Sequence, residues 1–269
     1  MSNNVVSRLK RKKIEEAIEQ GKRMDGRAID EYRDLEIKPE AIEKAEGSAE
    51  VRLGKTHVIV GIKVEEGTPF EDTPDAGVLI CNAEFSPVAH PTWEPGPPGE
   101  GAVELARVID RGLRSAEILD LEDLALVSGE KVLMVFVDLH VLNYDGNLID
   151  ASAAGALAAL MKSKKPVYNV KKGKAERTDE WKELNLLRKP VAVTLVKIGE
   201  NWIVDPTADE EEVMDTRLTV TLDEEDNVTT LQKSGTAGLK LDEIKEAINI
   251  AVDKAKDVRS IVEDSVDVE

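Results

Sequence analysis

Residues 131–161 read KVLMVFVDLHVLNYDGNLIDASAAGALAALM, and this stretch decides the fold. Residues 131–144 are rich in Val and Leu and predict a buried strand, and the alanine-rich run that follows predicts a closely packed helix over about 149–162. The Asp-Gly turn between them would leave unpaired amides at the start of the helix, where an anion is favoured. The side chains offered there are Leu148, Ile149 and Asp150. Two of these are apolar and the third is an anion, so the turn resembles a phosphate site with unsuitable side chains.

Upstream of this unit, the sequence predicts a sheet with a helix beside it. Residues 48–67 predict a β-hairpin and residues 77–86 a further strand. The segment 87–101 contains five prolines and predicts an irregular surface loop, which is followed by a helix at about 102–119.

Downstream, the sequence predicts a charged loop to about residue 189, then four strands, and a long amphipathic C-terminal helix over 239–263. The apolar face of that helix is expected at positions 241, 244, 248, 252, 255, 258 and 262. This order predicts an α/β (α+β) fold with mixed sheets. We expect two similar βαβα halves, about 1–165 and 166–269, packed into a single domain over 1–269.

The charge balance restricts the partners that the chain can have. Its 269 residues include 54 Asp+Glu and 36 Lys+Arg, and the formal net charge of −18 repels nucleic acid over the molecule as a whole. Basic runs occur at 10–13, 162–165 and 171–174, where solvated surface is the ordinary interpretation. The single cysteine, Cys81, suits a reducing compartment, and no apolar run approaches the roughly 18 residues of a membrane span. We therefore expect a cytoplasmic protein without a membrane partner.

The helix that includes ELARVIDRGLRSAE (104–117) contains a line of basic side chains. Arg107, Arg111 and Arg114 follow the spacing i, i+4 and i+7, so they share one face of the helix. Three guanidinium groups about one turn apart could bind successive phosphates of a nucleic acid strand. The alternative is pairing within the helix, because Glu104 and Asp110 lie three or four residues from these arginines.

The segment VDPTADEEEVMDTRLTV (204–220) concentrates carboxylates. Asp209 and Asp215 could hold a divalent cation through oxygen ligands, or act as an acid–base pair. A solvated acidic loop is the alternative. The sequence contains no Walker loop, zinc pattern or nucleophile motif, so it offers no candidate for nucleophilic catalysis.

Several segments together resemble one family. They are RMDGRAIDEYR (23–33), GSAEVRLGKTHVIVGIKVE (47–65), ELARVIDRGLR (104–114), DGNLIDASAAGALAAL (145–160) and SGTAGLKLDEIKEAI (234–248). In order and spacing they resemble the ribonuclease PH family, and most closely its non-catalytic members in the archaeal exosome ring. The resemblance implies a ribonuclease PH-like fold and an alternating hexameric ring, a trimer of heterodimers with a catalytic sister subunit. It also implies RNA-binding cap subunits and single-stranded RNA degraded from its 3′ end. Inorganic phosphate would be the attacking group, Mg²⁺ a possible requirement of the complex, and the chain itself would hold no cofactor.

The same resemblance implies that the phosphate site of this chain is degenerate. Catalytic members have a Thr-Arg pair in the turn, where Leu148 and Ile149 stand here, and a further phosphate-binding arginine where Gly101 stands. Asp150 is expected to add a repelling charge.

Other family positions are retained. Asp209 and Asp215 keep the six-residue spacing of the family's catalytic aspartates, and Arg107 and Arg111 match positions that reach RNA phosphates. Three functions therefore stay open: a non-catalytic subunit of a phosphorolytic 3′-to-5′ exoribonuclease ring, an autonomous phosphate-dependent exoribonuclease, and an acidic assembly scaffold without RNA contact.

Overall fold

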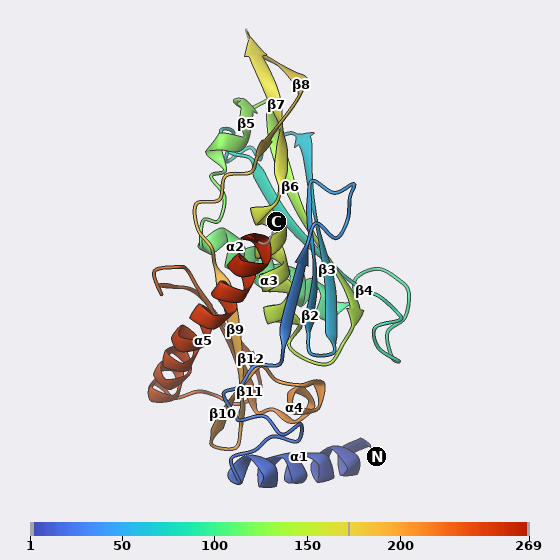
Figure 1. Cartoon of the computed structure of the whole chain (residues 1–269), viewed down its shortest axis with the longest axis vertical. Coiled ribbons are helices and arrows are strands. Elements are labelled where there is room, and N and C mark those ends of the chain that lie inside the picture. Colours follow the sequence, from blue (N-terminus) through green and yellow to red (C-terminus); the bar gives the residue numbers. More distant parts are fainter. Residues whose placement is uncertain (1–2, 172, 268–269) are drawn as a thin grey trace.

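The computed structural model describes residues 3–171 and 173–267, with side chains from residue 9 onward. Two sheets lie along the molecule with helices between and beside them, and a separate hairpin projects at one end (Figure 1). The elements are α1 (Asn3–Glu19), β1 (Leu35–Pro39), β2 (Gly47–Leu53), β3 (Thr56–Gly67), β4 (Val78–Phe85), α2 (Glu100–Ser115), a short 3-10 helix η1 (Glu122–Leu124), β5 (Ala125–Val127), β6 (Lys131–Asn143), α3 (Leu148–Met161), β7 (Lys164–Lys171), β8 (Lys174–Glu183), β9 (Val191–Ile198), β10 (Asn201–Val204), α4 (Ala208–Val213), β11 (Thr216–Leu222), β12 (Val228–Gly235) and α5 (Leu241–Asp267).

The first sheet has the order β1-β2-β3-β6-β4, with β5 paired to β6. β4 runs parallel to β6, and the other neighbours are antiparallel. The predicted hairpin is confirmed as β2 and β3, which are joined at Gly54 and Lys55. Gly54 has φ +57°, and a Cβ there would lie 2.7 Å from Cδ of Arg33, so both the backbone and the space require glycine.

The second sheet is antiparallel with the order β10-β9-β11-β12. Every residue of β9 is buried, and its sequence VAVTLVKI is apolar except at Thr194 and Lys197. The main buried cluster includes residues of both sheets, for example Val60 of β3 and Leu195 of β9. A second, smaller cluster packs Ile14 and Ile18 of α1 against β9 and β10. The single domain over 1–269 stays a prediction.

Helix α3 lies between the two sheets. Every residue from Leu148 to Leu160 is buried, because α3 packs against β2 and β3 on one side and against β9 and α5 on the other. Such a helix is expected to be apolar on every side, and Asp150 and Ser152 are the polar residues of α3. Small residues allow the close approach: a Cβ on Gly155 would lie 2.8 Å from Cγ2 of Val60 and 2.9 Å from Cγ2 of Val51. The alanine-rich sequence of α3 is therefore a packing requirement.

Two predictions about secondary structure are wrong. The charged loop expected after α3 contains the antiparallel hairpin β7–β8, in which Lys171 pairs with Lys174 beside a turn at Gly173. On α5, the predicted apolar face is wrong at its first position, since Leu241 is 67 % exposed. Ile244, Ile248 and Val252 are partly buried against the core, and Ala255 is fully buried, as predicted. Ala247 and Ala251, which the prediction left out, are also fully buried. Val258 and Val262 are buried as predicted. Within the described residues, no helix is both long enough and apolar enough to cross a bilayer.

Candidate functional site

The turn before α3 is closed by a second segment of the chain. Gly146 has φ +86°, and a Cβ there would lie 2.4 Å from the carbonyl oxygen of Pro206 and 2.5 Å from the nitrogen of Ala208. The Ala208 amide donates to the Asp145 carbonyl oxygen at 3.1 Å. Asn147 begins the helix with a left-handed backbone, φ 51°, and its side chain accepts from the Asp150 amide. The turn has the expected shape, but its outer side is covered by residues 206–208.

A carboxylate of the protein itself lies at this turn. Glu211 accepts a hydrogen bond from the Asn147 amide at 3.0 Å and another from the Tyr144 hydroxyl at 2.6 Å. Burial and the adjacent Glu211 raise the pKa of Tyr144 well above its ordinary value, so its hydroxyl stays protonated and donates. Arg217 lies 4.0 Å from the same carboxylate and balances part of its charge. Glu211 thus satisfies an amide that could otherwise have received a phosphate.

Leu148 and Ile149 do not face the turn. Both side chains are buried in the main core, with 9 % and 5 % of their surface exposed. The two positions where catalytic family members are expected to carry Thr and Arg therefore contribute to packing here.

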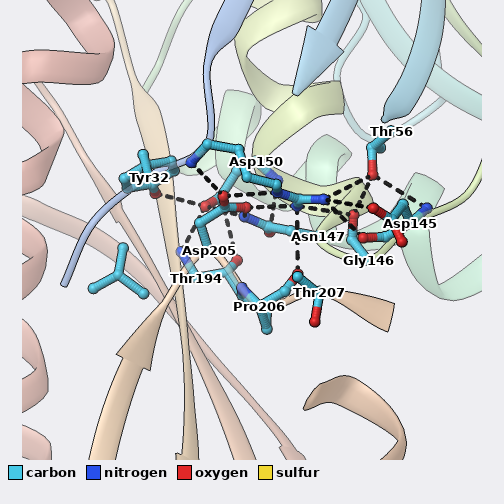
Figure 2. Close-up of polar contacts among 12 residues, drawn as sticks. Tyr32, Thr56, Asp145, Gly146, Asn147, Asp150, Thr194, Asp205, Pro206 and Thr207 are labelled. Atoms are coloured by element: carbon cyan, nitrogen blue, oxygen red, sulfur yellow. Dashed lines mark hydrogen bonds and ion pairs between the residues drawn. The ribbon is translucent and has the colours of Figure 1, made fainter. Parts of the chain in front are cut away.

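Asp150 is buried as well. We expected its charge to repel an anion at the turn, but its carboxylate lies inside the protein, against Thr194 of β9. Its carboxylate accepts hydrogen bonds from the Tyr32 hydroxyl at 2.6 Å, the Asn147 side-chain amide at 2.8 Å, and the Thr194 amide and hydroxyl at 3.0 and 2.7 Å (Figure 2). Burial raises the pKa of Asp150 to about 6, although these donors act in the opposite direction. The side chain joins α3 to β9 inside the protein, because the helix presents it to the second sheet rather than to the turn.

A group of arginines holds the turn and the 204–212 segment together. Asp205 accepts from Arg33 at 2.7 and 2.9 Å, from Arg27 at 2.9 Å, and from the Asn147 side chain at 2.8 Å. Arg33 also donates to the Asp145 carbonyl oxygen at 2.7 Å. Burial favours the neutral form of Asp205, but the hydrogen bonds and charge of Arg33 outweigh it and hold the pKa of this carboxyl below its ordinary value. Asp205 is therefore an ionised anchor between three segments.

Arg23 makes the deepest contact of this group. Its guanidinium is fully buried, pairs with Glu210, and donates to the carbonyl oxygens of Val204 and Asp205 at 2.8 Å each. Glu210 in turn completes a capping box with Thr207 at the start of α4. We refer to Arg23, Arg27 and Arg33 as the arginine clamp.

Asp209 and Asp215 are held by α1. Lys10 contacts Asp209 at 2.6 Å, and Arg11 contacts Asp215 at 2.8 Å; the Gly199 amide also donates to Asp215 at 2.9 Å. In the part of the chain that the structure describes, no three metal-ligating side chains form a group. This arrangement favours a role in anchoring α1 over cation binding or acid–base catalysis.

Of the three arginines predicted to bind RNA on α2, Arg114 is held by contacts within the protein. Arg114 pairs with Asp110 at 2.7 Å and donates to the Leu79 carbonyl oxygen at 2.5 Å. Glu104, the other carboxylate proposed to pair within the helix, contacts Arg217 of β11 at 2.7 Å instead.

Arg107 and Arg111 are consequently left on an open surface. Both are exposed and line a shallow groove of about 480 Å³ with Val103 and Gln232, and Arg111 donates to the Gln232 side chain at 2.9 Å. Among the described residues, neither takes part in an ion pair. We call Arg107 and Arg111 the arginine face.

Gly101 lies at the start of α2 beneath the proline-rich loop. A Cβ there would lie 3.1 Å from Cε2 of Phe85, whose ring stacks on Trp93 with centroids 4.3 Å apart. The loop is irregular, as predicted, and lines a pocket of about 730 Å³ over β4 and β6. Aromatic packing thus occupies the side of Gly101 where a longer side chain would begin.

The sequence matches two models described as the 3′ exoribonuclease family, domain 1 over residues 31–166 and domain 2 over residues 189–254. The chain belongs to the 3′ exoribonuclease family. The ribonuclease PH resemblance and the fold class predicted with it are thereby confirmed.

Full-length relatives of the family agree. The chain is similar to the exosome complex component Rrp42 of Thermococcus onnurineus, with 49 % identity over 98 % of both chains. The protein of the same name from Archaeoglobus fulgidus is 47 % identical over 96 % of this chain and 98 % of its own.

Two solved structures have the same fold. They are described as an Archaeoglobus fulgidus exosome with RNA bound to the active site and as an archaeal exosome core. The first has a TM-score of 0.87 and 45 % identity, and the match covers 95 % of this chain and 98 % of the other. The second has a TM-score of 0.85 and 42 % identity, and the match covers 98 % of this chain and 100 % of the other.

The arginine clamp and Glu211 were missed by sequence reasoning. The signal was present in two segments already singled out, because 23–33 carries three arginines and 204–212 carries five carboxylates. What the sequence could not show is that these segments meet, since Arg33 and Asp205 are 172 residues apart.

Proposed function

We propose that the chain is a non-catalytic subunit of the exosome, in which it shares a phosphorolytic 3′-to-5′ exoribonuclease ring with a catalytic sister subunit. The full-length relatives carry the name of exosome components, and the structural neighbours are exosome cores, one with RNA bound. In this proposal the chain alternates with its sister in a hexameric ring, a trimer of heterodimers, and RNA-binding cap subunits cover one face.

The closed turn carries the non-catalytic part of the proposal. Phosphorolysis requires the attacking phosphate to be held in position, and positioning supplies roughly 7–11 kcal/mol of barrier reduction in well-oriented reactions. In this chain the Asn147 amide is already bound to Glu211, and Ile149 is buried where the family would place an arginine. These contacts support the proposal that this turn does not hold the attacking phosphate.

The arginine face carries the RNA part of the proposal. Arg107 and Arg111 lie one turn apart on the exposed side of α2 beside a groove, with the nearby carboxylates of Glu104 and Asp110 bound to other arginines. Guanidinium groups in this arrangement fit successive phosphates of a strand. We leave Arg114 out of the proposed RNA surface, because its guanidinium is already committed to Asp110 and Leu79.

In the same proposal the chain holds no cofactor of its own, and inorganic phosphate, with Mg²⁺ where required, acts in the sister's active site. The strong negative charge is compatible with RNA binding if the strand is bound close to a few focused arginines. The free thiol of Cys81 suits the cytoplasm.

Activity with and without the sister tests the proposal. The purified chain, given RNA, phosphate and Mg²⁺, is expected to release no nucleoside diphosphates, and addition of the sister is expected to start their release. Robust release by the chain alone would overturn the proposal and favour an autonomous exoribonuclease.

A further inference from the structure

The hairpin β7–β8 is a structural element that the proposed function leaves unused. It forms a separate two-stranded sheet and projects beyond the end of the first sheet, at the opposite end of the molecule from α1 (Figure 1). The 8 residues of β7 extend over about 26 Å, at roughly 3.3 Å per residue. Near its base, Lys165 is buried and pairs with Asp123 at 2.5 Å. Toward its tip, the side chains are exposed on both strands.

The tip places two like charges directly opposite each other. Lys171 of β7 faces Lys174 of β8, and both are exposed. Like charges at directly opposed positions destabilise an antiparallel pair. Within the described residues neither lysine has an ion-pair partner, although the chain carries more acidic than basic residues. A local arrangement that opposes folding without a compensating contact is typical of functional surfaces.

Aromatic and cationic side chains continue down the hairpin. The Arg177 guanidinium lies 5.1 Å from the ring centroid of Trp181, which is 46 % exposed. Trp181 also lines a pocket of about 540 Å³ whose basic residues are Lys44, Lys162 and Lys164. Acidic residues are present too, since Glu40, Glu43 and Glu46 line the same pocket.

The hairpin nevertheless differs in charge from the rest of the chain. Its described residues, 164–171 and 173–183, contain six Lys or Arg and four Asp or Glu, a net charge of +2 in a chain of −18. Cations along an extended surface, interspersed with an aromatic ring, are the composition of surfaces that bind single-stranded nucleic acid.

We infer that the β7–β8 hairpin is a second RNA-binding surface, at which Lys171 and Lys174 bind phosphates of single-stranded RNA outside the arginine face. The inference rests on the proposed function in taking RNA as the ligand. Two adjacent ammonium groups that repel each other in the free protein are both neutralised by a polyanion. Binding therefore removes a repulsion in addition to forming two contacts.

The variant Lys171→Gln/Lys174→Gln tests the inference. It is assembled into the ring with the sister subunit, and labelled polyuridylate is titrated by fluorescence anisotropy without phosphate, so that the RNA is not consumed. Loss of two phosphate contacts is expected to reduce the slope of log K against log salt by about 1.4 and to weaken binding about tenfold near 0.15 M salt. The thermal unfolding temperature of the variant is expected to stay equal or rise, because the opposed lysines are gone. A binding loss without a stability loss excludes misfolding as its cause.

The matched control is Lys12→Gln/Lys13→Gln, which removes the same charge from exposed positions of α1. It is expected to leave the affinity and the salt slope unchanged. An unchanged affinity in the hairpin variant, or an equal loss in both variants, would overturn the inference. So would a labelled polyglutamate peptide that binds the wild-type ring more tightly than the RNA does and loses this affinity in the hairpin variant, because the hairpin would then fit an acidic protein partner. These readouts measure equilibrium binding, so their failure is distinct from release of nucleoside diphosphates by the chain alone.

Discussion

The variant Asp150→Asn provides the sharpest quantitative test of the structure. The pKa of Asp150 is raised from 3.8 to about 6, chiefly by burial, so the folded protein binds this proton more tightly than the unfolded chain does. The stability that this group contributes is therefore fully present below pH 3.8 and is lost as the pH rises through about 6. The difference of 2.2 pKa units corresponds to about 3 kcal/mol at 1.36 kcal/mol per unit. About 2 kcal/mol of this falls between pH 4 and 7.5.

Asparagine can replace the carboxylate without losing the network. Its carbonyl oxygen can accept from Tyr32, Asn147 and the Thr194 amide, and its NH₂ group can donate to the Thr194 hydroxyl, which now acts as the acceptor. The variant thus removes the titration and keeps the packing. The free energy of unfolding of the wild type, minus that of the variant, is expected to fall by about 2 kcal/mol from pH 4 to pH 7.5.

Urea unfolding followed by circular dichroism at four pH values measures this difference. Titrating groups far from Asp150 are present in both proteins and cancel in the comparison. Asp205 shares the Asn147 side chain with Asp150, but its pKa is held below its ordinary value, so Asp205 does not titrate between pH 4 and 7.5. Asp253→Asn, at an exposed position of α5, removes the same charge and is the control for the effect of net charge alone. A constant difference for Asp150→Asn, or one that grows with pH, would refute the assignment of a raised pKa to this buried carboxyl.

Three further predictions concern the arginine face, the clamp and the turn. Arg107→Glu/Arg111→Glu should leave ring assembly intact, as judged by size-exclusion chromatography, but weaken RNA binding and reduce the slope of log K against log salt by about 0.7 per lost contact. Unchanged affinity would favour a scaffold without RNA contact. Arg23→Met should lower the free energy of unfolding in urea by about 3–5 kcal/mol, because Glu210 is left buried without its ion-pair partner. Arg23→Met/Glu210→Met should recover most of that free energy. Equal stability of the single and double variants would contradict a buried pair. Ile149→Arg should destabilise the protein by several kcal/mol, because Ile149 is buried, and should not create affinity for phosphate. A fully stable variant that binds phosphate in calorimetry would show instead that the turn before α3 can accept this anion.

Local patterns in the sequence predict much of this fold. The strand, turn and helix over 131–161, the β2–β3 hairpin and the C-terminal helix all follow from periodicity and turn residues over short windows. The β7–β8 hairpin was missed because β8 is mostly charged and polar and has no buried residue, and only Lys165 and Pro166 of β7 are buried. An exposed two-stranded ribbon gives no hydrophobic pattern for the sequence to reveal.

The site was harder to predict for two physical reasons. Because α3 is apolar on every side, its sequence does not show which neighbours any one residue meets, and Asp150 was therefore assigned to the turn rather than to β9. The arginine clamp depends on pairing between segments that are far apart along the chain, and charge alone does not select one partner among 54 acidic residues. The division of the α2 arginines depended on the same long-range pairing, since Glu104 is taken by Arg217.

The arginine clamp has a consequence for the order in which the molecule is made. Arg23 and Glu210 are separated by 187 residues, so at about 5–20 residues per second a ribosome takes roughly 10–40 s to deliver the second after the first. During that interval Arg23 lacks Glu210, and Arg27 and Arg33 lack Asp205, although Arg27 keeps Asp25 within its own segment. The strands of the first sheet end at residue 143, so this sheet can form before the clamp closes. Closure of the clamp is therefore a late event in biogenesis, and a nascent chain that stops before residue 205 lacks Asp205 and Glu210, the two buried carboxylates that the clamp binds.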